Sequence, residues 1–142
     1  SDCAPLNRTI DLLYDVTDDI HVIRDATRGG VGTVLYEICE QSGVGIRLDM
    51  EAVPVSPAVQ GVCGMLGLEP LYLACEGRLV IIVPAADADG IIKILRQGPY
   101  SRNAAVIGEV TAADKGFVTM ITEIGTQTVL PPPSGELLPR IC

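Results

Sequence analysis

The residue with the plainest chemistry is a thiol at the end of a proline-rich segment. The segment opens with Pro131-Pro132-Pro133, and the last residue is Cys142. Because proline fixes φ and lacks a backbone donor, the three prolines predict a polyproline II spacer. At about 3.1 Å per residue, residues 131–142 would carry the sulfur across roughly 35 Å. A cysteine on such an arm can receive a group at one site and deliver it at another, whereas an inert, frayed terminus is the alternative.

A second group of candidate residues surrounds a predicted strand-to-helix turn. The segment reads Arg24-Asp25-Ala26-Thr27-Arg28-Gly29-Gly30. The guanidinium groups of Arg24 and Arg28 can grip a phosphate, and the backbone N–H groups of Gly29 and Gly30 at a helix N-terminus favour an anion. On the residues alone, a turn with solvated salt bridges of at most about 1 kcal/mol each explains the same pattern.

Glu76 is the candidate general base. It precedes a predicted apolar strand and is followed by Gly77, where a backbone can approach a ligand closely. Partial burial at this point would raise the pKa of the carboxyl toward neutral pH. As a turn residue ahead of the strand, Glu76 fits the sequence equally well.

The remaining cysteines and the one histidine indicate neither a disulfide framework nor a metal site. Five cysteines make an odd count, and no Cys-x-x-Cys pair occurs. Cys39 and Cys63 fall in apolar stretches and are expected to be buried. A Ser-His-Asp triad or a multi-histidine centre would depend wholly on His21. We therefore expect no metal ligands and no hydrolase triad.

Composition indicates one globular domain that binds no nucleic acid. The chain has 142 residues, of which 48% are hydrophobic, and its mean hydropathy is +0.38. A net charge of −8 argues against binding to a nucleic-acid backbone, and the absence of Trp with only one Phe argues against base stacking. No apolar run approaches the roughly 18–20 residues of a membrane span, and no leader opens the chain. We expect a soluble, cytoplasmic protein that contacts no membrane.

The hydrophobic pattern predicts an α+β fold in which helices cover a mixed β-sheet. Capping and glycine signals place the helices, and Gly43 ends the second one. No phosphate-binding loop of the Gly-x-x-x-x-Gly-Lys-Ser or Gly-x-Gly-x-x-Gly type is present. The expected helices are one from Ser1 or Asp2 to about Val16, one that follows the Gly29-Gly30 turn and ends at Gly43, and the ranges 57–66 and 88–95. The expected strands are 20–24, 44–48, 79–83, 104–111, 117–122 and 126–130, with 79–83 as a central strand.

Several segments, in order, resemble the HypE family of hydrogenase maturation factors. The ending Pro139-Arg140-Ile141-Cys142 is similar to the C-terminal signature of that family. The other similar segments are 24–30, 41–46, 67–72, 75–78 and 107–110. The resemblance covers nearly the whole chain.

The resemblance implies a function for the terminal thiol. In HypE proteins the terminal cysteine receives a carbamoyl group from the carbamoyltransferase HypF. ATP-dependent dehydration then gives a thiocyanate, which supplies the cyanide ligand of the NiFe-hydrogenase iron. Cys142 would be this cysteine, and Glu76 would match the catalytic Glu of the family's Asn-Glu-Gly-Lys segment. This chain differs there at Cys75 and Arg78, and Cys75 cannot make the hydrogen bonds of an Asn.

The resemblance also implies cofactors, partners and domains. HypE proteins are similar to the aminoimidazole-ribonucleotide synthetase and selenophosphate synthetase superfamily, whose first domain binds ATP and Mg²⁺ and dimerises. This chain would be the second domain (residues 1–130) with a Pro-rich tail (131–142), and the ATP-binding N-terminal domain would lie outside it. The expected partners are HypF, the HypC–HypD iron scaffold and a second copy of the full-length protein. The residues expected at ATP are Arg24, Asp25, Thr27, Arg28, Gly29 and Gly30.

Two other functions remain open at the level of sequence. A selenophosphate- or purine-type synthetase domain would share the fold but would have no reason to end in a reactive cysteine. A non-catalytic docking module would use the tail only to hold a partner. The fate of the Cys142 thiol distinguishes all three.

Overall fold

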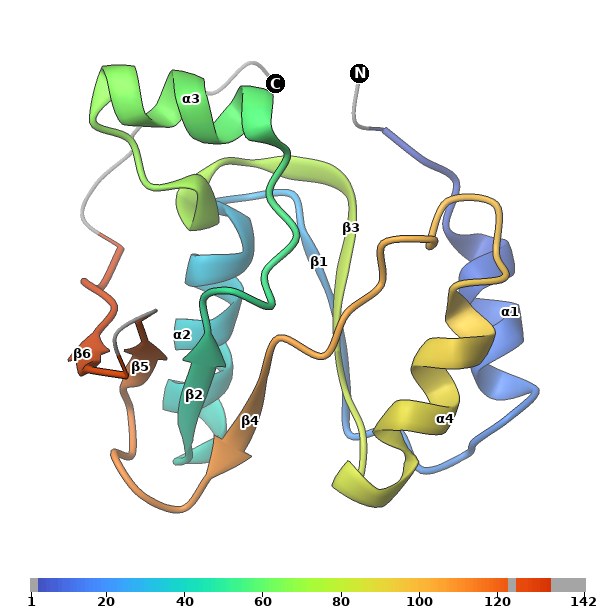
Figure 1. Ribbon diagram of the computed structural model, residues 1–142. Coiled ribbons are helices and arrows are strands. Elements are labelled where there is room, and N and C mark those ends of the chain that lie inside the picture. The colour runs from blue at the N-terminus through green and yellow to red at the C-terminus, as the bar shows by residue number, and fades with distance from the viewer. Residues whose placement is uncertain (1–2, 123–124, 134–142) are drawn as a thin grey trace.

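The computed structural model describes residues 3–122 and 125–133, as an α+β fold. The predicted tail residues 134–142, including Cys142, lie outside the described residues. In chain order the elements are α1 (Asn7–Tyr14), β1 (Val22–Ala26), α2 (Gly30–Ser42), β2 (Gly45–Asp49), α3 (Pro57–Leu66), the 3₁₀ helix η1 (Pro70–Tyr72), β3 (Cys75–Ile82), α4 (Ala85–Leu95), β4 (Gly108–Thr111), β5 (Val118–Ile121) and β6 (Gln127–Val129) (Figure 1).

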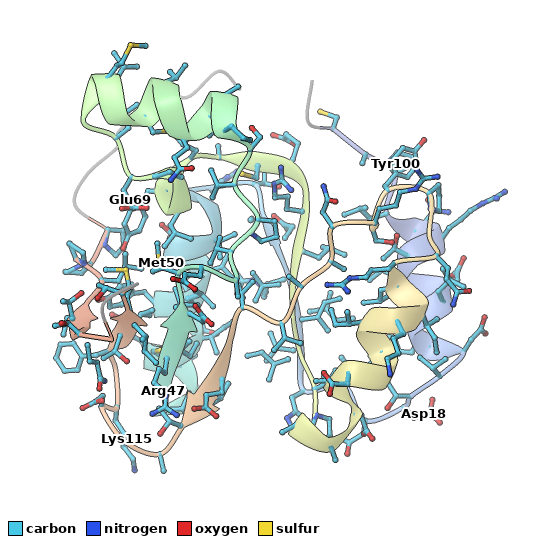
Figure 2. The ribbon with its side chains drawn as sticks, in the orientation of Figure 1. Asp18, Arg47, Met50, Glu69, Tyr100 and Lys115 are labelled. Atoms are coloured by element: carbon cyan, nitrogen blue, oxygen red, sulfur yellow. The ribbon has the colours of Figure 1, made fainter. Side chains whose placement is uncertain are left out.

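The strands form two sheets within the described residues. One is the antiparallel ribbon β1–β3, and the other is a four-stranded mixed sheet in the order β4-β2-β5-β6. In the mixed sheet, β2 runs antiparallel to β4 and parallel to β5, and β5 runs antiparallel to β6. The exposed Arg47 of β2, labelled in Figure 2, pairs with Glu109 of the edge strand β4.

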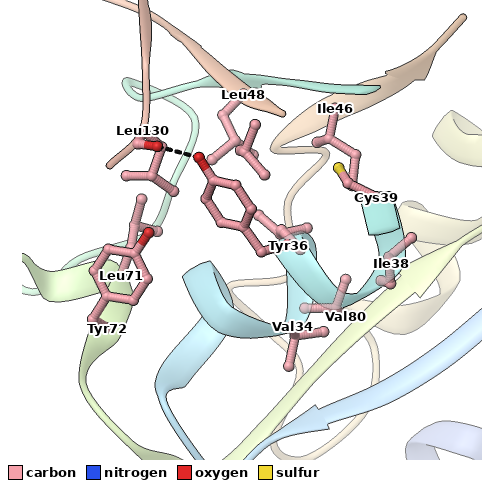
Figure 3. Packing of buried hydrophobic residues seen from close by; sticks show 12 residues of the cluster. Val34, Tyr36, Ile38, Cys39, Ile46, Leu48, Leu71, Tyr72, Val80 and Leu130 are labelled. Carbon is pink, nitrogen blue, oxygen red and sulfur yellow. Dashed lines mark hydrogen bonds between the residues drawn. The ribbon is translucent and has the colours of Figure 1, made fainter. Parts of the chain in front are cut away.

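Two hydrophobic clusters lie on opposite sides of the β1–β3 ribbon. Helix α2 and the mixed sheet enclose the larger cluster, whereas α1 and α4 enclose the smaller one around Leu13, Ile91 and Leu95 (Figure 1). The ribbon contributes Val80 to the first cluster and Ile81 to the second. Figure 3 shows the larger cluster, whose buried members are Val34, Leu35, Tyr36, Ile38, Cys39, Ile46, Leu48, Leu71, Tyr72, Val80, Val118 and Leu130.

The helices with clear end signals match their predicted bounds. Helix α3 spans Pro57–Leu66 as expected, and the Ser56 hydroxyl accepts a hydrogen bond from the N–H of Val59 at 3.4 Å. Helix α2 ends at Gly43, which adopts a left-handed conformation with φ of 63°. Local capping residues therefore define the start of α3 and the end of α2.

The prediction of a central strand at 79–83 is wrong. Strand β3 begins at Cys75 and pairs only with β1, in a ribbon of two strands. Its apolar run arises because α2 covers one face of the ribbon and α1 with α4 cover the other. Burial on both faces gives the same sequence pattern as a central position in a sheet.

Other bounds differ by a few residues. Helix α1 begins at Asn7, without a side-chain cap at Leu6, rather than at the expected Ser1 or Asp2, which lie outside the described residues. Helix α4 begins three residues earlier than predicted, directly after Pro84. The expected strand 104–111 is reduced to β4, because only its last residues pair with β2, and the strands expected at 20–24, 117–122 and 126–130 correspond to β1, β5 and β6.

Candidate functional site

The β1–β3 ribbon brings the segment containing Glu76 beside the predicted anion loop. Asp25 pairs with Leu79, but the next residue, Ala26, pairs with Cys75. One step along β1 therefore matches four steps along β3, which leaves residues 76–78 as a bulge. Bulges of this kind redirect side chains and are frequent next to active sites. Two sequence motifs about fifty residues apart thus meet at the end of β1.

A hollow lies where β1 ends and α2 begins. Its volume is about 350 Å³. The lining residues are Arg24, Asp25, Thr27, Arg28, Val34 and Glu37. Four of the predicted site residues therefore come together here, joined by two residues of α2 that the sequence did not single out.

The two arginines of the hollow differ in their availability. Nη2 of Arg24 lies 2.5 Å from a carboxylate oxygen of Glu37, and both side chains are about 40% exposed. Arg28 is exposed and has no ion-pair partner among the described residues. Glu37 therefore orients and neutralises Arg24, while Arg28 presents a guanidinium that can neutralise an incoming anion.

Asp25 forms a local turn with Thr27. The backbone N–H of Thr27 donates to Oδ1 of Asp25 at 3.2 Å. Hydrogen bonding from Thr27 holds the pKa of Asp25 below its usual value, so the carboxylate is ionised at neutral pH. With two arginines and two carboxylates, the lining of the hollow carries no net charge. The hollow can thus bind one phosphoryl group through Arg28, but these residues are not a complete triphosphate site.

Gly30 has a packing role that the sequence did not reveal. It is buried, its φ is +67°, and a Cβ on it would lie 2.4 Å from the carbonyl oxygen of Leu71 and 2.5 Å from that of Leu73. Gly29 is exposed before α2. Neither glycine lines the hollow, although Gly29 directly follows Arg28 in the chain.

Glu76 is exposed and lies inside β3 rather than ahead of the strand. The expected partial burial of this carboxylate is therefore not found in the chain. Glu76 does not line the hollow, although the ribbon places its neighbour Cys75 opposite Ala26. The half-buried Cys75 thiol donates to the carbonyl of Leu73 at 3.1 Å, a contact within its own turn.

Cys39, Cys63 and His21 do not line the hollow. Cys39 and Cys63 are buried as predicted, and burial raises the pKa of the Cys39 thiol. His21 is exposed, with Nε2 3.2 Å from Asp19. The described part of the chain contains no group of three or more histidine, cysteine or acidic side chains that could hold a metal, and none of its helices is long and apolar enough to cross a membrane.

Several residues that shape this region carried no sequence signal. Glu37 pairs with Arg24 across thirteen residues. The hydroxyls of Tyr36 and Tyr72 donate to the carbonyls of Leu130 and Pro131, respectively. The tyrosines belong to the apolar faces of α2 and η1, where their spacing predicts only burial. Their hydroxyl contacts depend on the tertiary fold.

Known proteins match both the sequence and the fold. Residues 1–121 match the family described as AIR synthase related protein, C-terminal domain. Carbamoyl dehydratase HypE of Cupriavidus necator is 48% identical over all 142 residues, which span 40% of that relative. A crystal structure of the hydrogenase maturation protein HypE superposes with a TM-score of 0.93 at 44% identity, covering all of this chain and 46% of the other.

Two further solved structures are similar to this chain. A HypE structure in complex with ATP has a TM-score of 0.90 at 44% identity and covers all of this chain and 44% of the other. The HypE–HypF complex has a TM-score of 0.89 at 41% identity and covers 94% of this chain and 43% of the other.

The matched fold and sequence define a class: a C-terminal domain of the kind found in AIR synthase related proteins. The chain belongs to that family and, within it, to the HypE proteins, with which it aligns along its full length. It spans about 40% of the length of the curated HypE relative.

Proposed function

We propose that this chain is the second domain and carrier tail of an ATP-dependent carbamoyl dehydratase. In this reaction the S-carbamoyl group on Cys142 loses water and becomes a thiocyanate, which supplies cyanide for a NiFe-hydrogenase iron. The observation that carries the proposal is the β1–β3 register, which sets the Glu76 bulge against the loop that bears Arg28. A base and a phosphate-neutralising cation are the two groups that this dehydration needs.

The reaction requires the carbamoyl oxygen to leave and the nitrogen to lose two protons. ATP supplies a phosphoryl group to that oxygen, which then departs as phosphate when its bond to carbon breaks. One nitrogen proton passes to solvent as the oxygen is phosphorylated, and a carboxylate accepts the second as the carbon–oxygen bond breaks and the carbon–nitrogen triple bond forms. We assign this role to Glu76, which is exposed at the bulge of β3 beside the Arg28 loop.

Arg28 neutralises charge on the phosphoryl oxygens, and the Glu37 contact keeps Arg24 in place at the same hollow. Thr27 and Asp25 fix the turn that presents Arg28. Gly29 and Gly30 begin α2 beside it, where backbone N–H groups favour an anion. Because the lining of the hollow has no net charge, we propose that ATP and Mg²⁺ are held mainly by an N-terminal domain outside this chain.

We further propose the boundaries 1–130 for the folded domain and 131–142 for the tail. The burial of Leu130 and the exposure of the three prolines after it support this division. The solved HypE–HypF complex supports HypF as the partner that loads the tail. The same assignment implies three further properties of the full-length protein. It would pass cyanide to the HypC–HypD scaffold, form a homodimer and lie in the cytoplasm.

The Glu76→Gln variant of the full-length protein tests the proposed chemistry. Gln keeps the shape of Glu and loses its basicity, so ATP binding and carbamoylation of Cys142 should persist. Dehydration should slow by about 10²–10⁴-fold, the usual contribution of a general base. The ratio of carbamoylated to dehydrated tail, measured by mass spectrometry, gives the result, and a thermal melt checks folding. Thiocyanate formation at the wild-type rate would remove Glu76 from the mechanism.

A further inference from the structure

The tail leaves the folded body from a defined point. Leu130 is fully buried within the larger hydrophobic cluster, and its N–H donates to the carbonyl of Val118 at 2.9 Å. The next three residues, Pro131–Pro133, are exposed. The chain therefore passes from complete burial to the surface across one peptide bond, and Leu130 with Pro131 forms the root of the tail.

Two tyrosine hydroxyls hold the root. Tyr36 of α2 donates to the carbonyl of Leu130 (Figure 3), and Tyr72 of η1 donates to the carbonyl of Pro131. The tyrosines are 6% and 9% exposed, respectively. Burial raises the pKa of both hydroxyls, that of Tyr72 to about 12, so both remain protonated donors at neutral pH.

Helix α2, which carries Tyr36 and contacts Tyr72, also lines the hollow. Tyr36 is followed in α2 by Glu37, which lines the hollow. The ring of Tyr72 packs against α2 at Gly32, where a Cβ would lie 2.5 Å from it. Since a helix rises about 1.5 Å per residue, Tyr36 lies about 9 Å along α2 from Gly30. One rigid helix thus connects the root of the tail with the hollow.

We propose that Tyr36 and Tyr72 are positioning residues that anchor the tail and thereby set the effective concentration of the Cys142 thiol at the hollow beside Arg28. This inference rests on the proposed function of Cys142 as the carrier. Eleven residues follow Pro131. Fully extended, they span up to about 36 Å, which is far enough to return along α2 to the hollow and also to reach outward.

Loss of the anchor has a calculable effect. If the chain detached back to Thr122, twenty residues would separate the fixed point from the thiol instead of eleven. Effective concentration falls roughly as the −3/2 power of tether length, so it would drop about 2.5-fold. Loss of the direction imposed by the prolines would reduce it further.

The position of the root can be measured without any assay of activity. In the full-length protein with accessible cysteines changed to serine, nitroxides are placed at Lys93→Cys on α4 and at Ser134→Cys, just beyond the prolines. The distance distribution should broaden in the Tyr36→Phe/Tyr72→Phe double variant and stay narrow in the control Tyr100→Phe, an exposed tyrosine (Figure 2). An unchanged distribution in the double variant would overturn the anchor. If that variant does not fold, Tyr72→Phe alone is measured.

The effect on the reaction is separated from any effect on folding by supplying the tail in two ways. The full-length double variant processes its own carbamoylated tail, and the same variant truncated after Pro133 receives a synthetic S-carbamoyl peptide of residues 134–142. We expect the rate with the attached tail to fall at least about 2.5-fold and the rate with the free peptide to match that of the truncated wild type. Equal losses in both arms, or no loss in either, would refute the positioning role. If the wild type forms no thiocyanate, the proposed function fails, and the distance measurement alone decides whether the tyrosines anchor the tail.

Discussion

Replacing Gly30 by alanine should destabilise the domain strongly, because two independent costs fall on this residue. Its φ of +67° is a left-handed conformation that costs an alanine about 1–2 kcal/mol. The new Cβ would also lie 2.4 Å from the carbonyl oxygen of Leu71, and displacing packed backbone costs about 1–3 kcal/mol. Lower entropy of the unfolded chain offsets about 0.4–1 kcal/mol. The net loss should be about 3 kcal/mol.

The matched control is Gly64→Ala in α3. A Cβ at Gly64 meets nothing within 4 Å, and alanine is favoured over glycine inside a helix by about 1 kcal/mol. Urea denaturation of the chain, followed by circular dichroism, should therefore shift the midpoint down for Gly30→Ala and up for Gly64→Ala. A Gly30→Ala variant within about 1 kcal/mol of wild type would refute the inferred contact between α2 and η1.

Three further results are expected. Cys142→Ala in the full-length protein should abolish thiocyanate formation and leave the urea midpoint unchanged, because we propose that the folded domain ends at residue 130 and a tail residue contributes little to stability; thiocyanate formed by this variant would contradict the carrier role. Burial raises the pKa of Tyr72 from its ordinary 10.0 to about 12, so the folded state holds the hydroxyl proton more tightly than the unfolded state does. The stabilisation that this gives the folded state is complete below pH 10 and is lost as the pH rises through 12. Between pH 10 and 12 the free energy of unfolding should fall by up to about 2–3 kcal/mol more in the wild type than in Tyr72→Phe. An equal dependence of that free energy on pH in the two proteins would disprove the buried hydroxyl donor. Calorimetric titration of this chain alone should show no low-micromolar ATP binding, since the lining of the hollow, Arg28 included, carries no net charge; such binding would place the nucleotide site within the chain.

Elements with local end signals were predictable from the sequence. Ser56 and Pro57 define the start of α3, and Gly43 defines the end of α2, because capping depends on a few neighbouring residues. Strand β3 was assigned to the wrong sheet position, since burial on two faces produces the same apolar run in a two-stranded ribbon and in a central strand.

The candidate site was predictable in part. The residues from Arg24 to Arg28 are contiguous, so a short motif was enough to group them, and the structure places them at one hollow. Glu37 and the two tyrosines were missed because their contacts are long-range; Tyr36 and Leu130 are 94 residues apart in the chain. The β1–β3 register that brings Glu76 near this loop likewise depends on tertiary pairing. The roles of Glu76 and Cys142 remain predictions.

Intact-mass measurement of the tail tests the central claim most directly. The full-length protein is incubated with carbamoyl phosphate and its carbamoyltransferase, first without and then with ATP for dehydration, and the peptide containing Cys142 is weighed. We expect a gain of one carbamoyl group on the sulfur of Cys142, followed by the loss of one water that depends on ATP. A tail that gains no carbamoyl group, or that keeps it unchanged when ATP is present, would contradict the proposed function.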